Sequence, residues 1–157
     1  MNSRSDSSAI FEFERDFEQS LRCVPMSVRM KLDLSGVKIS LKQWNRLSAQ
    51  DRQQLLQSAC ASPDERARFA RQVQQMVEAR TAQSAGALPV DPSPPWEIEG
   101  EVPTQIIDRQ RSLGLAPLSL AQWQGLSAVR RFALLKLSRP GHDNENFVPA
   151  LREFGLL

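Results

Sequence analysis

The sequence predicts an all-α fold, and three observations support that fold class. Alternation of β-branched and aromatic residues between turns, the usual mark of a strand, is weak along the whole chain. Helix starts marked by serine or proline and stops marked by glycine recur instead. Apolar residues make up 41% and charged residues 24% of the 157 residues, which is ordinary globular composition. We therefore predict one compact helical domain over residues 11–157, preceded by a flexible tail over 1–10.

The first predicted helices follow that tail. Phe13, Phe17 and Leu21 recur at helical spacing, which places them on one face of a helix. Pro25 opens the next helix, and Gly36 suits the left-handed residue that ends it. Two further helices are expected immediately after this stop.

Serine caps define the helices that follow. Ser40 is expected to cap a short helix, and Ser48 a longer one in a capping-box variant with Asp51. Ser62 then precedes proline and two acidic residues, which is a strong helix start. No breaker occurs until about Thr81, so we predict a long amphipathic helix over 63–81.

A proline-rich segment over residues 84–96 follows the long helix. Four prolines exclude a regular helix there and favour an extended chain. Such a segment is long enough to return along the whole helix, so we expect a helix followed by an antiparallel linker.

An internal repeat relates residues 24–56 to residues 102–135. Its first part matches at an offset of 78 residues, and from Ser40 onward the offset is 79, with identical residues at ten positions. A unit of this size cannot bury its own apolar face. We therefore predict two copies of a helix-loop-helix-helix unit, related by a pseudo-twofold and joined by the long helix and the linker. The predicted repeat core consists of Pro25, Gly36, Trp44, Leu47, Leu55, Pro103, Gly114, Trp123, Leu126 and Leu134.

Two residue types kept in both copies allow a functional and a structural interpretation. Trp44 and Trp123 are interpreted as core residues rather than partner anchors, each with an acceptor for its indole N–H. Arg52 and Arg131 are interpreted as caps of helix ends, or as partners of an acid across the copies, rather than as anion ligands.

The chain contains few of the residues that catalysis and metal binding usually require. The chain has one histidine, two cysteines without CxxC spacing and no tyrosine, so we predict no catalytic, cofactor-binding or metal site. The turn at residues 141–145 contains His142, and one alternative is a small-ligand sensor or enzyme that uses Cys23 and His142. A second alternative is a nucleic-acid-binding regulator that uses the paired helices, although a net charge of +2 gives little attraction for a polyanion. Without a signal or membrane segment, a cytoplasmic location is expected.

Several strings resemble one known family. They are the RCxPM-x-VR pattern with KLD over residues 21–33, the segment 132–138, Phe147, and the terminal Glu153-Phe154-Gly155-Leu156. With these strings the chain resembles the bacterial nitrate reductase-associated protein family, collinearly from about Phe11 to its end. The resemblance implies a small soluble protein encoded beside genes for nitrate assimilation and molybdenum-cofactor synthesis. That family has no established activity, so the resemblance transfers no catalytic residue.

The predicted function is that of a non-enzymatic accessory protein of nitrate assimilation. It would bind a protein partner, either nitrate reductase or the machinery that loads its molybdenum cofactor. Arginine and tryptophan are common anchors of interfaces, and they define the candidate partner surface. Its residues are Arg66, Arg68, Arg71, Arg80 and Trp96.

Overall fold

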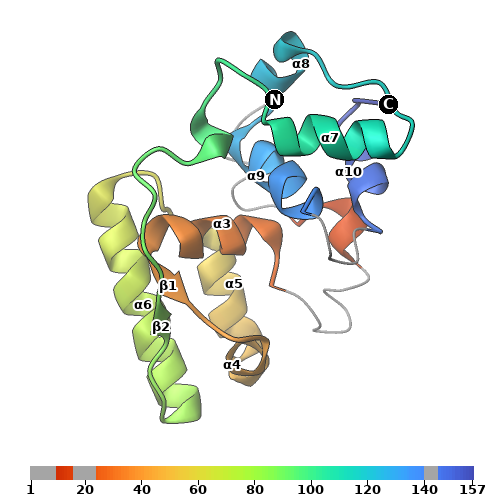
Figure 1. Ribbon diagram of the computed structural model, residues 1–157. Helices are drawn as coiled ribbons and strands as arrows, with labels where there is room; N and C mark the ends of the chain where they lie inside the picture. The colour runs from red at the N-terminus through yellow and green to blue at the C-terminus, as the bar shows by residue number, and fades with distance from the viewer. Residues whose placement is uncertain (1–9, 16–23, 140–144) are drawn as a thin grey trace. The chain divides into compact units, whose positions relative to one another are not determined.

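Nearly all regular structure is helical in the computed structural model, which describes residues 10–15, 24–139 and 145–157 (Figure 1). The predicted all-α class is therefore confirmed. The chain divides into an N-terminal unit, Asn2–Pro92, and a C-terminal unit, Ser93–Leu157. Residues 1–9 of the predicted tail, the helical positions Phe17 and Leu21, and the pair Cys23 and His142 lie outside the described residues.

The N-terminal unit consists of helices that pack around the longest of them. α3 contacts both α5 and α6, and α4 contacts α6. Phe69, Val73 and Val77 form the buried stripe of α6, as its 3.6-residue period predicts. The elements are η1 (Glu12–Glu14), α3 (Met26–Ser35), α4 (Leu41–Arg46), α5 (Ala49–Gln57) and α6 (Pro63–Thr81).

The predicted serine caps of this unit are present. The side chains of Ser40, Ser48 and Ser62 each accept a hydrogen bond from the backbone N–H three residues later. In each case the side chain of that third residue accepts the serine backbone N–H in return, which completes a capping box. These helix starts are therefore set by contacts within four residues, which is why the sequence reveals them.

The start of α3 differs from the prediction. Pro25 stands just before the first helical residue and has no capping side chain. The carboxylate of Glu14 supplies the acceptor instead, because it receives the backbone N–H of Met26 at 2.7 Å and that of Phe11 at 3.2 Å. Gly36 ends the helix in the left-handed region at φ +72°, as predicted.

The proline-rich segment returns along α6, as expected. The amide of Gln74 on α6 exchanges two hydrogen bonds with the backbone of Ala85, and β2 (Gly86–Ala87) pairs antiparallel with β1 (Val37–Lys38) (Figure 1). The expectation that 84–96 contains no helix is wrong at its end. There η2 (Pro95–Glu97) forms one 3₁₀ turn, which proline tolerates because the first residues of a helix need no N–H partner.

The C-terminal unit is organised around α9. This helix contacts η2, α7 and α10, and its residues Phe132, Ala133 and Leu134 are completely buried. Phe147 and Leu151 on α10 are also completely buried, so the C-terminal helix is part of the core of this unit. The elements after η2 are α7 (Thr104–Ser112), α8 (Leu120–Gln124), α9 (Ala128–Leu137) and α10 (Phe147–Glu153).

The repeat positions take similar local structure in their own units. Ser119 and Ser127 cap α8 and α9 as Ser40 and Ser48 cap α4 and α5. The tryptophans and leucines of the predicted repeat core are buried. Three members are not: Gly36 and Pro103 are half-buried, and Gly114 is exposed with no atom within 4 Å of a Cβ built there. Glycine is favoured at position 114 because the backbone there is left-handed, at φ +72°, and not because the position is tightly packed. The pseudo-twofold packing of the two copies stays a prediction.

Among the described residues, no helix combines the length and the apolar character needed to cross a bilayer.

Candidate functional site

The repeated arginine of the first copy caps a helix end. Arg52 on α5 donates from Nε to the carbonyl of Trp44 at 3.3 Å and from Nη2 to that of Asn45 at 3.1 Å. Its guanidinium also lies 5.5 Å from the centroid of the Trp44 ring. These carbonyls end α4, where a cation complements the helix dipole. The structural interpretation of Arg52 is therefore confirmed.

The matching arginine of the second copy is buried more deeply. Arg131 donates from Nε to the carbonyl of Trp96 at 2.6 Å and from Nη1 to that of Leu126, and its guanidinium lies 5.8 Å from the Trp123 ring centroid. Its Nη2 lies 3.6 Å from a carboxylate oxygen of Glu99. Of the two structural alternatives for this arginine, the helix-end cap is the one observed, because Leu126 lies just after α8 and Trp96 lies in η2; the acid near it, Glu99, precedes the second copy within the same unit. Arg131 is therefore occupied within the C-terminal unit.

The one cysteine that the structure describes lies beside a buried lysine. The Sγ of Cys60 lies 3.2 Å from the hydroxyl of Ser35, and burial raises the pKa of the thiol above its ordinary value. Lys31 is 2% exposed and donates to the carbonyls of Leu55 and Leu56 at 3.3 and 2.7 Å. Burial lowers the pKa of Lys31 to about 8. The thiol is therefore protonated near neutral pH, and the ammonium holds the end of α5.

The residues of the predicted partner surface belong to both units. Arg66 donates to the carbonyl of Cys60 at 3.2 Å, and Arg80 pairs with Asp51 at 2.9 Å. Trp96 belongs to the C-terminal unit, where it is half-buried and packs edge-on against Phe132, with the ring centroids 4.9 Å apart. Each of these three side chains has a partner within its own unit.

Arg68 and Arg71, the other members of the predicted surface, lie together on the outer face of α6. We call this face the α6 outer surface; its exposed residues recur at heptad spacing and are Asp64, Arg68, Arg71, Gln75 and Glu78. Two acids accompany the two arginines, so the surface has no excess charge. It is typical of a solvated helix side.

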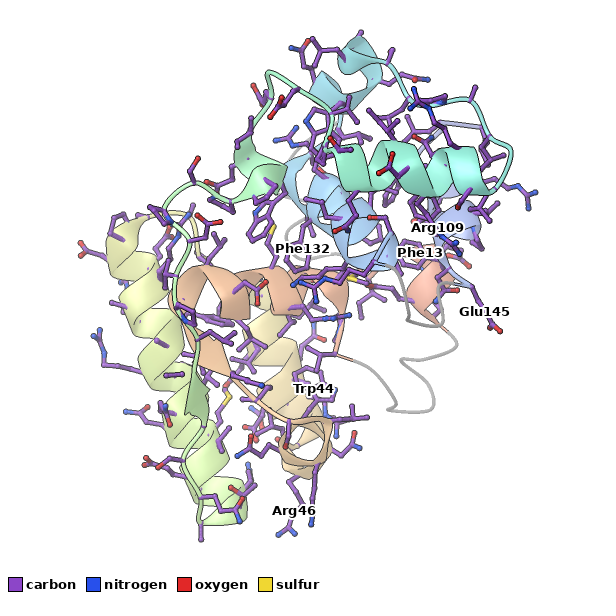
Figure 2. The ribbon with its side chains drawn as sticks, viewed as in Figure 1. Phe13, Trp44, Arg46, Arg109, Phe132 and Glu145 are labelled. Carbon is purple, nitrogen blue, oxygen red and sulfur yellow. The ribbon has the colours of Figure 1, made fainter. Side chains whose placement is uncertain are left out.

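A second charged surface on the N-terminal unit is not compensated. We call it the α4 basic surface; it consists of Lys38, Lys42 and Arg46, all exposed, together with Leu41. Lys42 and Arg46 are four residues apart and share one side of α4, whereas Leu41 lies three residues before Trp44 and is nearer to the side of that buried ring. Figure 2 shows Trp44 and Arg46 on this short helix. Leu41 is 46% exposed, and its counterpart in the second copy, Leu120, is exposed to a similar extent at 43%.

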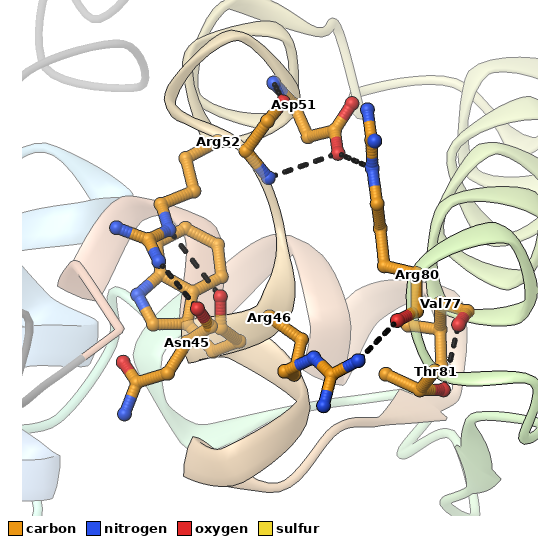
Figure 3. A network of polar contacts seen from close by, with 9 residues as sticks. Asn45, Arg46, Asp51, Arg52, Val77, Arg80 and Thr81 are labelled. Carbon is orange, nitrogen blue, oxygen red and sulfur yellow. Dashed lines mark hydrogen bonds and ion pairs between the residues drawn. The ribbon is translucent and has the colours of Figure 1, made fainter.

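The polar network at this end of the unit fixes one of these cations (Figure 3). Arg46 donates from Nη2 to the carbonyl of Arg80, near the end of α6, at 3.2 Å. Asp51 accepts from Arg80 at 2.9 Å and from the backbone of Ser48 at 3.1 Å. Burial opposes the ionisation of Asp51, but these hydrogen bonds hold its pKa below the usual value. Asp51, the acid nearest to Arg46 in the sequence, is therefore paired with Arg80 and not with Arg46.

The sequence contains a signal for the α4 basic surface that motif searching does not detect. Residues 34–50 contain three cations and no acid. The matching window of the repeat, residues 113–129, contains no charged residue at all. Charge balance over the whole chain conceals this local excess.

Comparison with known proteins agrees with the resemblance noted from the sequence. No curated protein and no solved structure shows significant similarity to the chain. A family model described as conserved nitrate reductase-associated protein matches residues 10–154, which is nearly the whole chain. The match includes both units and every surface described above. The chain therefore belongs to the conserved nitrate reductase-associated protein family.

Proposed function

We propose that this protein is a non-enzymatic accessory protein of nitrate assimilation, located in the cytoplasm, that acts by binding a protein partner. The partner is nitrate reductase itself or the machinery that loads its molybdenum cofactor. The family match over residues 10–154 carries the proposal, because it associates the chain with that enzyme.

The use of the buried polar side chains supports a binding role. Lys31 and Arg131 are the buried cations among the described residues, and each is held by backbone carbonyls of its own unit. Gln110 is also fully buried, and it accepts the backbone N–H of Leu118 at 3.1 Å. Buried polar side chains that are hydrogen-bonded to the backbone of their own unit stabilise the fold. The exposed charged side chains are therefore the groups that would recognise a partner.

The proposal is tested by affinity purification of the full-length tagged protein from nitrate-grown cells that contain a nitrate reductase. We expect the reductase, detected by antibody and by activity, to be retained specifically. The matched control is the same tag on an unrelated protein of similar size. An extract rich in reductase from which the tagged protein retains none would contradict the proposal.

A second measurement separates the two partners named above. Purified apo-reductase is incubated with a molybdenum-cofactor source, with and without the protein, and recovery of activity is followed. Acceleration indicates a role in loading. Retention of the reductase without acceleration indicates binding to the mature enzyme.

A further inference from the structure

We propose that the α4 basic surface is a docking site for an acidic segment of a protein partner, one rich in aspartate and glutamate. This inference rests on the proposed function and names the part of the molecule that would perform it. The observations that carry it are the local charge, the comparison of the two copies, and the side chains that surround the cations.

The local charge is positive and is not neutralised nearby. Lys38, Lys42 and Arg46 are exposed, and no acid occurs between residues 34 and 50. The window is bordered by Asp33 and Asp51, and Asp51 pairs with Arg80 at 2.9 Å. Two of the cations lie four residues apart on α4, an arrangement that destabilises a helix by repulsion. Carboxylates of a partner would remove this repulsion.

The second copy of the repeat shows that the fold does not need these cations. At the positions of Lys42 and Arg46 it has Ala121 and Gly125, and residues 115–118 carry no charge. α8 nevertheless begins at the same capping box and buries its tryptophan in the same way as α4. Cap, tryptophan and arginine are shared because they build the unit, whereas the cations are present in one copy alone. Arg46 has a use in the fold, because it donates to the carbonyl of Arg80 near the end of α6, and the second copy is not followed by such a helix. Lys38 and Lys42 have no such use among the described contacts, so the placement of these two lysines calls for a reason other than folding.

The surroundings of the cations favour protein over nucleic acid. Leu41 at the start of α4 is 46% exposed, as is Leu120 at the start of α8 at 43%, so the helix that carries the cations also offers one apolar side chain to a protein surface. The Arg46 guanidinium is held by the carbonyl of Arg80, so less side-chain freedom is lost on binding. A duplex offers a continuous row of phosphates that requires more cations than this surface and a net charge of +2 provide.

The test compares two double charge reversals in the full-length protein. One is Lys42→Glu with Arg46→Glu on the α4 basic surface. The control is Arg68→Glu with Arg71→Glu on the α6 outer surface, which changes the net charge equally on exposed helix positions. Circular dichroism and thermal melting establish that both variants are folded. The milder pair Lys42→Ala and Arg46→Ala serves if the reversal fails to fold.

The first probe is a fluorescein-labelled oligoglutamate peptide, followed by anisotropy at low salt. We expect the α4 reversal to weaken binding about tenfold, because two attractive exposed pairs become repulsive. The control is expected to change the affinity less than about twofold, since its surface is already balanced by acids. Binding that is absent in the wild type, or reduced equally by both variants, overturns the inference. Tighter binding of a duplex DNA probe through the same residues also overturns it.

The second probe is nitrate reductase captured from extract by each variant. Retention by the wild type and the control, with loss in the α4 reversal, supports both proposals. Retention by all three proteins overturns the docking site and leaves the proposed function intact. If the wild-type protein retains no nitrate reductase, the proposed function is contradicted. The oligoglutamate experiment then tests by itself whether the α4 basic surface binds an acidic peptide.

Discussion

The buried ammonium of Lys31 gives this protein an unusual dependence of stability on pH. The side chain is 2% exposed and its pKa is lowered to about 8 from an ordinary value of 10.5, mainly by burial and against a small opposing effect of Cys60. Between those two pH values the unfolded chain binds the proton more tightly than the folded chain. The free energy of unfolding therefore rises with pH in this window, because folding is then no longer opposed by a buried charge.

The size of this effect follows from the difference between the two pKa values. One pKa unit corresponds to about 1.4 kcal/mol, so the contribution of Lys31 between pH 7 and pH 10 is about 2 kcal/mol. Lys31→Met removes the titration and also the hydrogen bonds to the Leu55 and Leu56 carbonyls, at 3.3 and 2.7 Å. Near pH 7 these lost bonds and the removed buried charge have opposite effects on stability. The change with pH in the stability difference between wild type and variant reports on the buried charge alone, because the carbonyl groups of Leu55 and Leu56 do not titrate.

The assay is urea unfolding of wild type and Lys31→Met at several pH values between 7 and 10. We expect the stability of the wild type relative to the variant to increase by about 2 kcal/mol over this range. A parallel series in a Cys60→Ser background serves as the control, since the thiol has a raised pKa and lies near the lysine. A difference between wild type and variant that stays constant across pH would refute the reasoning.

Two further pairs of variants use the repeat as its own control, and urea unfolding is the measurement for both. Gly36 and Gly114 share φ +72°, so Gly114→Ala is expected to cost about 1 kcal/mol through the backbone alone. Gly36→Ala is expected to cost more, because its Cβ would lie 2.9 Å from Cγ2 of Val90; equal costs would contradict this. Arg131→Met is expected to cost about 3 kcal/mol, since it leaves two carbonyls without their donor. Arg52→Met, at a half-buried position, is expected to cost about 1 kcal/mol, and the reverse order would refute the argument.

Features that depend on near neighbours in the chain were predictable from the sequence. Ser40, Ser48 and Ser62 reveal their helices because cap and partner lie within four residues. Gly36 reveals a helix end because a left-handed residue is required there. The burial of Trp44 and Trp123 was predictable for a related reason, since each follows its cap at the same helical position.

The candidate surface was predicted only in part. An arginine-rich helix face was predicted, but the sequence did not reveal that Arg66 and Arg80 turn to partners in their own unit. Those partners lie outside α6: the carbonyl of Cys60 belongs to the loop before it, and Asp51 belongs to α5. The α4 basic surface was not predicted, because its three cations are spread over nine residues and acids elsewhere in the chain bring the net charge close to zero.

By itself the sequence determined the helices, their caps, the repeat and the family, because each depends on local spacing or on a string of residues. Tertiary structure alone decided which polar side chains are used internally. Glu14 holds the start of α3 from twelve residues away, and Lys31 holds the end of α5 from twenty-five. Such contacts form only when distant segments pack and exclude water, and that exclusion makes an internal partner necessary for each buried polar group.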